Sequence, residues 1–299
     1  MSVEPTPPPV PRRSAWWVRL AARSPWWLLN GLADALAWLA WRVFPYRQHV
    51  VRENLTIAFP ELDAAALGGL MHGYYRGFAQ VAVEILKSTR MSAEELRERV
   101  RLTGLEAVRT QLDAGSSVLL VAAHQCNWEW MLLSLSLQLG YPLDAAYKPL
   151  VDPWAEREML TVRTRFGARL VPAQGLLGDV IKRGKVVRAI AMVADQEPRT
   201  SEHKHWVRFL NRDTAFYVGA EEIARVTRLA VFFVGMRRVA RGRYEVELAP
   251  LAGRAEPLPG GELTERYVRK VEAQIRAAPA DWPWSHKRWK LKKSLYGRA

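Results

Sequence analysis

Residues 118–130 read VLLVAAHQCNWEW. The first six of these residues form a short apolar run with β-branched side chains, which is typical of a buried strand. Trp128 begins a second apolar segment that continues to Leu139 and is followed by Gly140, a pattern that predicts a helix with a glycine stop. The stretch therefore predicts a strand, a tight polar turn and a helix.

Strand and helix patterns alternate along the rest of this half of the chain. Further strands are predicted at 143–147, 170–171, 186–194, 229–236 and 244–248, with a turn at 241–243 joining the last two. Helices are predicted at 154–166, 176–183, 215–227 and 262–277. Such alternation predicts an α/β fold with a mixed central sheet flanked by helices.

The N-terminal part of the chain has a different composition. Residues 1–14 are rich in proline and predict a disordered leader. Residues 15–45 are apolar and carry tryptophans along their whole length, together with Asn30 and Asp34. This distribution favours helices lying in a membrane interface, while a spanning helix and a buried core helix remain alternatives. Residues 46–299 then form the main domain, which begins with helical connectors, a turn at 54–60 and a capping box from Ser92 to Glu95.

Composition limits the classes of partner. The chain has 299 residues, a net charge of +14, thirteen tryptophans and one cysteine. A basic, Trp-rich surface suits either nucleic acid or an anionic membrane. The tryptophans gather in the apolar N-terminal stretch and no nucleic-acid-binding signature is present, which argues against nucleic acid. With Cys126 alone, and with His203 and His205 lacking carboxylates at ligand spacing, we predict no metal and no cofactor.

Polar clusters follow two of the predicted buried strands. One is His124 to Glu129, and the other is Asp195-Gln196-Glu197. Active sites of α/β sheets gather at the carboxyl ends of strands. Glu129 could fold back onto the imidazole of His124, which would make His124 a base for an alcohol. The alternative is that His124 caps the helix while Glu129 pairs with an arginine. No serine occupies a nucleophile position, so we expect direct attack by a substrate hydroxyl.

The motif HQCNWEW resembles the His-x4-Asp/Glu motif of the bacterial lipid A acyltransferases, the late acyltransferases related to glycerolipid acyltransferases. Five further segments resemble family segments in the right order, namely Tyr147-Lys148-Pro149, residues 163–167 (RTRFG), Asp195-Gln196, residues 206–215 (WVRFLNRDTA) and residues 284–290 (WSHKRWK). Asn211 stands where the family usually has glycine, so the local turn is expected to differ. The resemblance runs from about residue 15 to residue 292 and implies a glycerolipid-acyltransferase-like fold.

The resemblance also implies a reaction and a location. An acyl-carrier protein would donate a fatty acyl chain to a hydroxyl of a lipid A precursor, at the cytoplasmic face of the bacterial inner membrane. Another glycolipid or a secondary-metabolite lipid is the alternative acceptor. His124 would be the general base and Glu129 would orient it.

Several further residues are site candidates by the same resemblance. Arg163, Arg165 or backbone N–H groups at the start of the 128–139 helix would face the oxyanion. The candidates for substrate binding are Asn127, Tyr147, Lys148, Asp195, Gln196, His286 and Arg288. Helix capping is the alternative role for Asn127, and a solvated tail is the alternative for the basic run 286–293.

Overall fold

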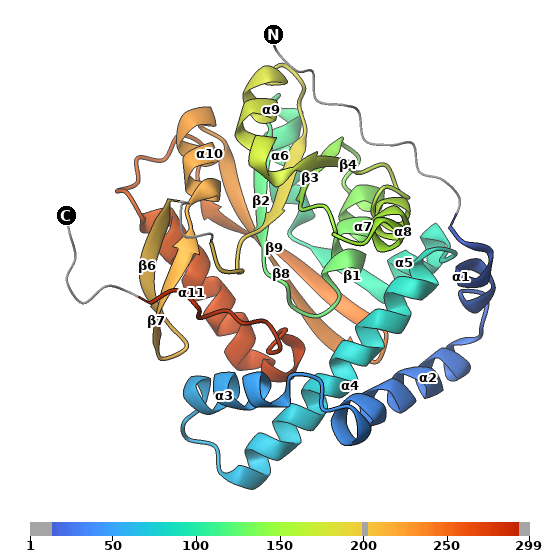
Figure 1. Cartoon of the computed structure of the whole chain (residues 1–299). Helices are drawn as coiled ribbons and strands as arrows, with labels where there is room; N and C mark the ends of the chain where they lie inside the picture. Colours follow the sequence, from blue (N-terminus) through green and yellow to red (C-terminus); the bar gives the residue numbers. More distant parts are fainter. Residues whose placement is uncertain (1–13, 199–202, 293–299) are drawn as a thin grey trace.

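The computed structural model describes residues 14–198 and 203–292 (Figure 1). Of the predicted leader at residues 1–14, all but Ser14 lies outside the described residues, as does Lys293, the last residue of the basic run.

A seven-stranded mixed sheet forms the centre of the molecule. Its order is β1-β9-β8-β2-β5-β3-β4, and all neighbouring pairs are parallel except β8 and β9. The strands are β1 (Val100–Thr103), β2 (Val118–Ala122), β3 (Leu143–Tyr147), β4 (Arg169–Pro172), β5 (Ala189–Val193), β8 (Ala230–Ala240) and β9 (Arg243–Ala252). The fold class and the hairpin across 241–243 are as predicted.

Helices cover both faces of the sheet because the central strands are apolar on both sides. On β2, Leu119 and Val121 enter one core, whereas Val118, Leu120 and Ala122 enter the other. The first core is closed by α3 (Gln48–Ala58), α4 (Ala64–Ser88), α9 (Leu176–Lys182), α10 (Gly219–Thr227) and α11 (Glu262–Ala277). The second is closed by α5 (Ala93–Arg99), α6 (Leu105–Asp113), α7 (Trp128–Gln138) and the end of α8 (Pro153–Arg163). A completely buried β2 therefore lies in the middle of the molecule.

Two predicted elements differ from the structure. Residues 215–217 belong to a strand and not to a helix, because β6 (Lys204–Phe209) and β7 (Arg212–Tyr217) form an antiparallel hairpin before α10 begins at Gly219. Its turn residues, Leu210 and Asn211, have φ values of 48° and 64°, and asparagine tolerates this left-handed region well. The turn predicted at 54–60 starts later, because α3 continues to Ala58.

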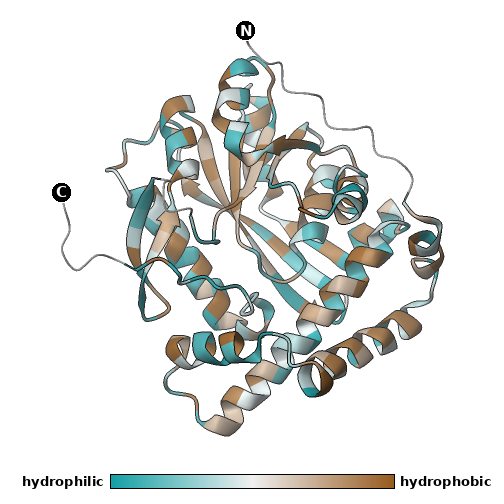
Figure 2. Ribbon diagram, in the orientation of Figure 1, coloured by the Kyte–Doolittle hydropathy of each residue, from teal (hydrophilic) through white to brown (hydrophobic). Residues whose placement is uncertain are grey.

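The Trp-rich N-terminus forms α1 (Trp16–Ala21), α2 (Trp26–Trp38) and a π-helical turn, η1 (Leu39–Val43). Leu29, Ala33 and Ala37 of α2 are buried, and α2 lies along α4 (Figure 1). The other sides of α2 are exposed although they are largely apolar (Figure 2). Within the described ranges, no helix is long and apolar enough to cross a membrane.

Candidate active site

The site is built by the carboxyl ends of two neighbouring parallel strands. Ala122 ends β2, Val193 ends β5, and these two residues are register partners. Each strand is followed by one alanine and then by a polar residue, His124 after β2 and Asp195 after β5. Equal spacing beyond a shared register brings the two side chains together at one edge of the sheet.

A short hydrogen bond joins the imidazole to the carboxylate. His124 Nδ1 lies 2.6 Å from Asp195 Oδ1, and the His124 backbone N–H donates to Asp195 Oδ2 at 3.1 Å. Trp282 Nε1 donates to the same Oδ2 at 2.9 Å. Asp195 is completely buried, and burial alone would raise its pKa. The charge of His124 and the hydrogen bonds from His124 and Trp282 outweigh that effect and lower the pKa, which keeps the carboxylate ionised.

The second ring nitrogen of His124, Nε2, is not bonded to Asp195. The carboxylate on Nδ1 favours a proton on that nitrogen, which leaves Nε2 as the basic atom. Gln196 Nε2 lies 3.4 Å from this atom and can donate to it, which agrees with the same tautomer. The His124 side chain is 16% exposed, and the Trp128 ring meets it edge-on at 5.2 Å between centroids. His124 is thus an oriented base with a partly exposed side chain.

Glu129 does not meet His124 in the way that the sequence had led us to expect. Its carboxylate accepts from Arg163 Nε at 2.8 Å and from Arg163 Nη2 at 2.6 Å. Trp128 Nε1 donates to Glu129 Oε1 at 3.1 Å. The helical path of α7 carries Glu129 towards α8, whereas Asp195 is fixed beside His124 by the strand register. The carboxylate that orients the imidazole is therefore Asp195, and Glu129 is the bidentate partner of Arg163.

The turn between β2 and α7 is tightly fixed. Cys126 adopts a φ of 55°, which is unusual for a non-glycine residue, and its N–H donates to the Asp281 carbonyl at 2.9 Å. Its thiol is buried, and burial raises the pKa well above the ordinary value. A buried, protonated thiol is a poor nucleophile. The geometry therefore argues against an acyl-cysteine intermediate.

Asn127 has the capping role. Its Oδ1 accepts from the Trp130 N–H at 3.0 Å, and its Nδ2 donates to Glu84 Oε2 at 2.8 Å. The side chain has no exposed surface, so in this conformation it cannot touch a substrate. It positions the start of α7 instead.

Glu84, which the sequence analysis did not single out, lies behind this turn. Besides Asn127, it accepts from Tyr244 at 2.7 Å and from Gln80 at 3.0 Å. Its pKa is raised because burial outweighs these hydrogen bonds. Nothing in the local sequence distinguishes Glu84 from other carboxylates on an amphipathic helix. Only the packing of α4 against α7 and β9 reveals it.

Of the other predicted residues, Tyr147 lies near the Glu129–Arg163 pair, whereas Lys148 and Arg165 do not contribute to it. Tyr147 is the last residue of β3. Burial and the charge of Glu156 raise its pKa, whereas the charge of Arg163 lowers it. Tyr147 therefore lies near the Glu129–Arg163 pair. Lys148 is exposed on the following loop. Arg165 donates to the Ser88 carbonyl at the end of α4, and its pKa is lowered by burial and by Arg90. Arg165 is thus held by a helix terminus rather than by the site.

The C-terminal segment packs into the molecule and is not a solvated tail over its described part. Arg288 is buried, donates to the carbonyls of Asp195 and Ala215 at 2.6 Å each, and has a pKa lowered to about 10 by burial. This gives Arg288 a positioning role under Asp195, with no exposed surface for a substrate. His286 is half-buried near the site, where burial and then Arg288 lower its pKa.

No group of three or more side chains suited to hold a metal ion occurs among residues 14–198 and 203–292. The His-x-His pair is used in other contacts, since His203 pairs with Glu222 at 3.1 Å and His205 with Glu265 at 2.9 Å.

Known proteins place this chain in one family. Residues 14–291 match the family model of bacterial lipid A biosynthesis acyltransferases. The lipid A biosynthesis lauroyltransferase of Escherichia coli (strain K12) is 24% identical over 277 residues, which cover 91% of this chain and 89% of that protein. The palmitoleoyltransferase of the same strain is 23% identical over 281 residues, covering 92% and 88%. A Shigella flexneri lipid A biosynthesis acyltransferase is also 23% identical over 281 residues, with the same coverage. The chain therefore belongs to the bacterial lipid A biosynthesis acyltransferase family.

Proposed function

We propose that this protein transfers a fatty acyl chain from acyl-carrier protein to a hydroxyl of a lipid A precursor, with His124 as the general base. The observation that supports this most directly is the hydrogen bond of 2.6 Å between His124 Nδ1 and Asp195. It leaves Nε2, which lies 3.4 Å from the side-chain amide of Gln196, as the nitrogen that can accept a proton.

The proposed reaction is a direct attack. His124 Nε2 removes the proton of the acceptor hydroxyl, and the oxygen attacks the thioester carbonyl carbon. The tetrahedral intermediate then collapses with cleavage of the C–S bond, and the proton passes from His124 to the departing thiolate. Asp195 stabilises the imidazolium during these steps. The burial of Cys126 supports a route without an acyl-enzyme.

Arg163 is the better of the two candidates for stabilising the oxyanion. Its side chain is 18% exposed, and its guanidinium is oriented by the bidentate contact with Glu129, whose side chain is 3% exposed. Trp128 contacts both the His124 ring and Glu129, so the arginine pair is linked to the base through one side chain. Arg165 instead donates to a helix carbonyl. A preorganised cation beside the developing charge is the arrangement that acyl transfer needs.

The acceptor and donor also suit the surface of the protein. An acidic carrier protein and a phosphorylated glycolipid are both negatively charged, so both would be attracted to a protein with a net charge of +14. The exposed tryptophans and leucines of α1 and α2 support association with the cytoplasmic face of the inner membrane.

The test incubates the purified protein with acyl-carrier protein thioesters and candidate acceptors, and reads the products by mass spectrometry. We expect one added acyl chain on a lipid A precursor and none with the His124→Ala variant. An added chain on a different glycolipid only would replace the proposed acceptor. Full activity of His124→Ala would overturn the proposed mechanism.

A further inference from the structure

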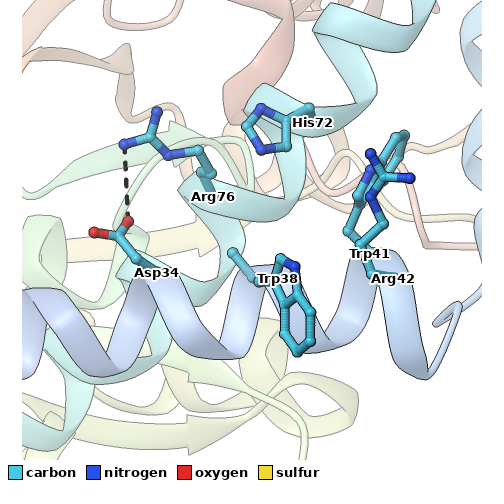
Figure 3. Close-up of a pocket in the computed structure, with 7 residues that line it drawn as sticks. Asp34, Trp38, Trp41, Arg42, His72 and Arg76 are labelled. Carbon is cyan, nitrogen blue, oxygen red and sulfur yellow. Dashed lines mark ion pairs between the residues drawn. The ribbon is translucent and has the colours of Figure 1, made fainter.

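A pocket away from the strand ends lies between the α2–η1 segment and α4. Its volume is about 410 Å³, which is within the range of small-ligand sites. Its polar and aromatic lining consists of Asp34, Trp38, Trp41, Arg42, His72 and Arg76 (Figure 3). None of these residues has a part in the proposed chemistry.

Helical periodicity explains why these side chains share one groove. Asp34, Trp38 and Arg42 follow one another at intervals of four residues, and His72 and Arg76 are one turn apart on α4. Residues at this spacing lie on the same face of a helix. Two contacts bridge the groove (Figure 3): Asp34 lies 3.7 Å from Arg76, and Trp41 packs edge-on against His72 at 6.1 Å. The π-helical turn at Leu39–Val43 sets the positions of Trp41 and Arg42, and such turns often occur at functional sites.

The groove carries more positive than negative charge. Asp34 is the one carboxylate in the lining, and it already accepts from Arg241 at 2.9 Å and 3.1 Å, in addition to a looser contact with Arg76 at 3.7 Å. Arg42 has no ion-pair partner among the described residues, and both Arg42 and Arg76 are exposed. Positive charge therefore remains available in the pocket. Guanidinium groups with N–H donors in a planar fork are well suited to a phosphate.

The surroundings of the pocket indicate where that phosphate comes from. Trp27 is 74% exposed, Trp38 59% and Phe44 69%, all on the same N-terminal segment. Leu28, Leu32 and Leu36 add an exposed apolar row along α2. Tryptophan favours the headgroup depth of a bilayer, and contiguous exposed apolar side chains are typical of membrane contact. On a membrane contacted by these side chains, a basic pocket beside them would lie near the lipid phosphates.

We propose that the pocket between α2–η1 and α4 binds the phosphate of an anionic phospholipid headgroup in the bilayer. Arg42 and Arg76 contact the phosphate, while Trp38 and Trp41 lie beside the glycerol and the upper acyl chains. This inference rests on the membrane association that is part of the proposed function. Because α2 and α4 pack together, a lipid held here also fixes the orientation of the N-terminal helices on the membrane.

The test is vesicle co-sedimentation of the full chain with phosphatidylcholine alone and with phosphatidylcholine containing phosphatidylglycerol. The pocket variant is Arg42→Gln/Arg76→Gln. The matched control is Arg19→Gln/Arg23→Gln, which removes the same charge from α1 and the turn after it. We expect wild type to prefer the anionic vesicles, and the pocket variant to lose about tenfold in their apparent partition coefficient. The control should lose distinctly less, and all variants should bind neutral vesicles alike. A third variant, Arg42→Lys/Arg76→Lys, keeps the positive charges but lacks the planar guanidinium donors. Its partition coefficient on anionic vesicles should lie between those of wild type and the pocket variant.

Several outcomes would overturn the proposal. Equal losses in the pocket variant and the control would mean diffuse surface attraction. Competition by inorganic phosphate, with saturable binding in the absence of vesicles, would mean a soluble ligand. Unchanged vesicle binding with a raised KM for the glycolipid acceptor would assign the pocket to the substrate. If the wild-type protein bound neither kind of vesicle, both this proposal and the proposed membrane association would be wrong. Acyl transfer measured in detergent micelles tests the proposed reaction separately.

Discussion

The imidazole of His124 and the carboxylate of Asp195 meet across two adjacent parallel strands, 71 residues apart in the chain. The carboxylate is itself fixed by the indole N–H of Trp282, and its backbone carbonyl is fixed by the guanidinium of Arg288. An oriented imidazole with a buried, ionised partner is a general base with one available nitrogen.

Asp195→Asn should lower kcat by about 10²- to 10⁴-fold, because an amide neither stabilises the imidazolium nor favours the Nδ1–H tautomer. KM for the acceptor should change little. Steady-state kinetics across a range of pH measures both parameters. The exposed Asp213→Asn on β7 is the control and should behave as wild type. If Asp195→Asn retained the wild-type kcat and pH profile, the orienting role of this carboxylate would be refuted.

Glu129 and Arg163 should behave as a coupled pair. Glu129→Gln leaves a largely buried guanidinium without its charge partner and should lower the free energy of unfolding by about 3 kcal/mol. Adding Arg163→Gln removes the unpaired charge, so the double variant should be more stable than the sum of the single effects implies. Denaturant unfolding of the four proteins in the cycle measures the coupling. Additive losses would mean that the bidentate contact contributes no interaction energy.

The activities of the same variants test whether Arg163 stabilises the oxyanion or only holds Glu129 in position. If Arg163 faces the oxyanion, Arg163→Gln should lower kcat by about 10²-fold or more while KM is largely unchanged. Arg165→Gln is the matched control from the same segment and should affect stability more than kcat, since its guanidinium serves the end of α4. A kcat loss confined to Arg165→Gln would reverse this assignment.

Cys126→Ser should retain acyl transfer. The thiol is buried and its pKa is raised by burial, so we expect no covalent intermediate on this side chain. Incubation with the acyl donor alone, followed by mass spectrometry of the intact protein, should show no added acyl chain. A stoichiometric acyl adduct that disappears in Cys126→Ser, together with loss of activity, would establish the covalent route instead.

His286 should make the protein less stable in mild acid. Burial and then Arg288 lower its pKa in the folded state, so below its ordinary value of 6.5 the unfolded chain binds the proton more readily. The free energy of unfolding therefore falls as pH decreases through that value, until the folded-state pKa is reached. The slope due to one proton is at most about 1.4 kcal/mol per pH unit. In His286→Gln this decrease should be smaller, as measured by denaturant unfolding between neutral and mildly acidic pH. An unchanged slope would exclude His286 as its source.

Much of the fold is present in local sequence patterns. The apolar runs of β2, β5 and β8 and the apolar segment of α7 that ends at Gly140 each occur within one contiguous stretch, as does the pattern of α11, and all of these elements form as predicted. The β6–β7 hairpin was missed because its turn uses Leu210 and Asn211 in left-handed conformations, a weaker signal than Asn-Gly.

The sequence by itself determined that a histidine follows a buried strand, that one cysteine is present, and that apolar, Trp-rich helices begin the chain. The tertiary structure alone decided which carboxylate meets His124, since Asp195 comes beside it through the register of β2 and β5 and Glu129 is directed to Arg163 by α7. It also decided that Glu84 is buried behind the turn and that α2, η1 and α4 line a basic pocket. The physical reason is range: helix and strand periodicity depend on neighbouring residues, whereas strand order and helix packing depend on contacts between residues far apart in the chain.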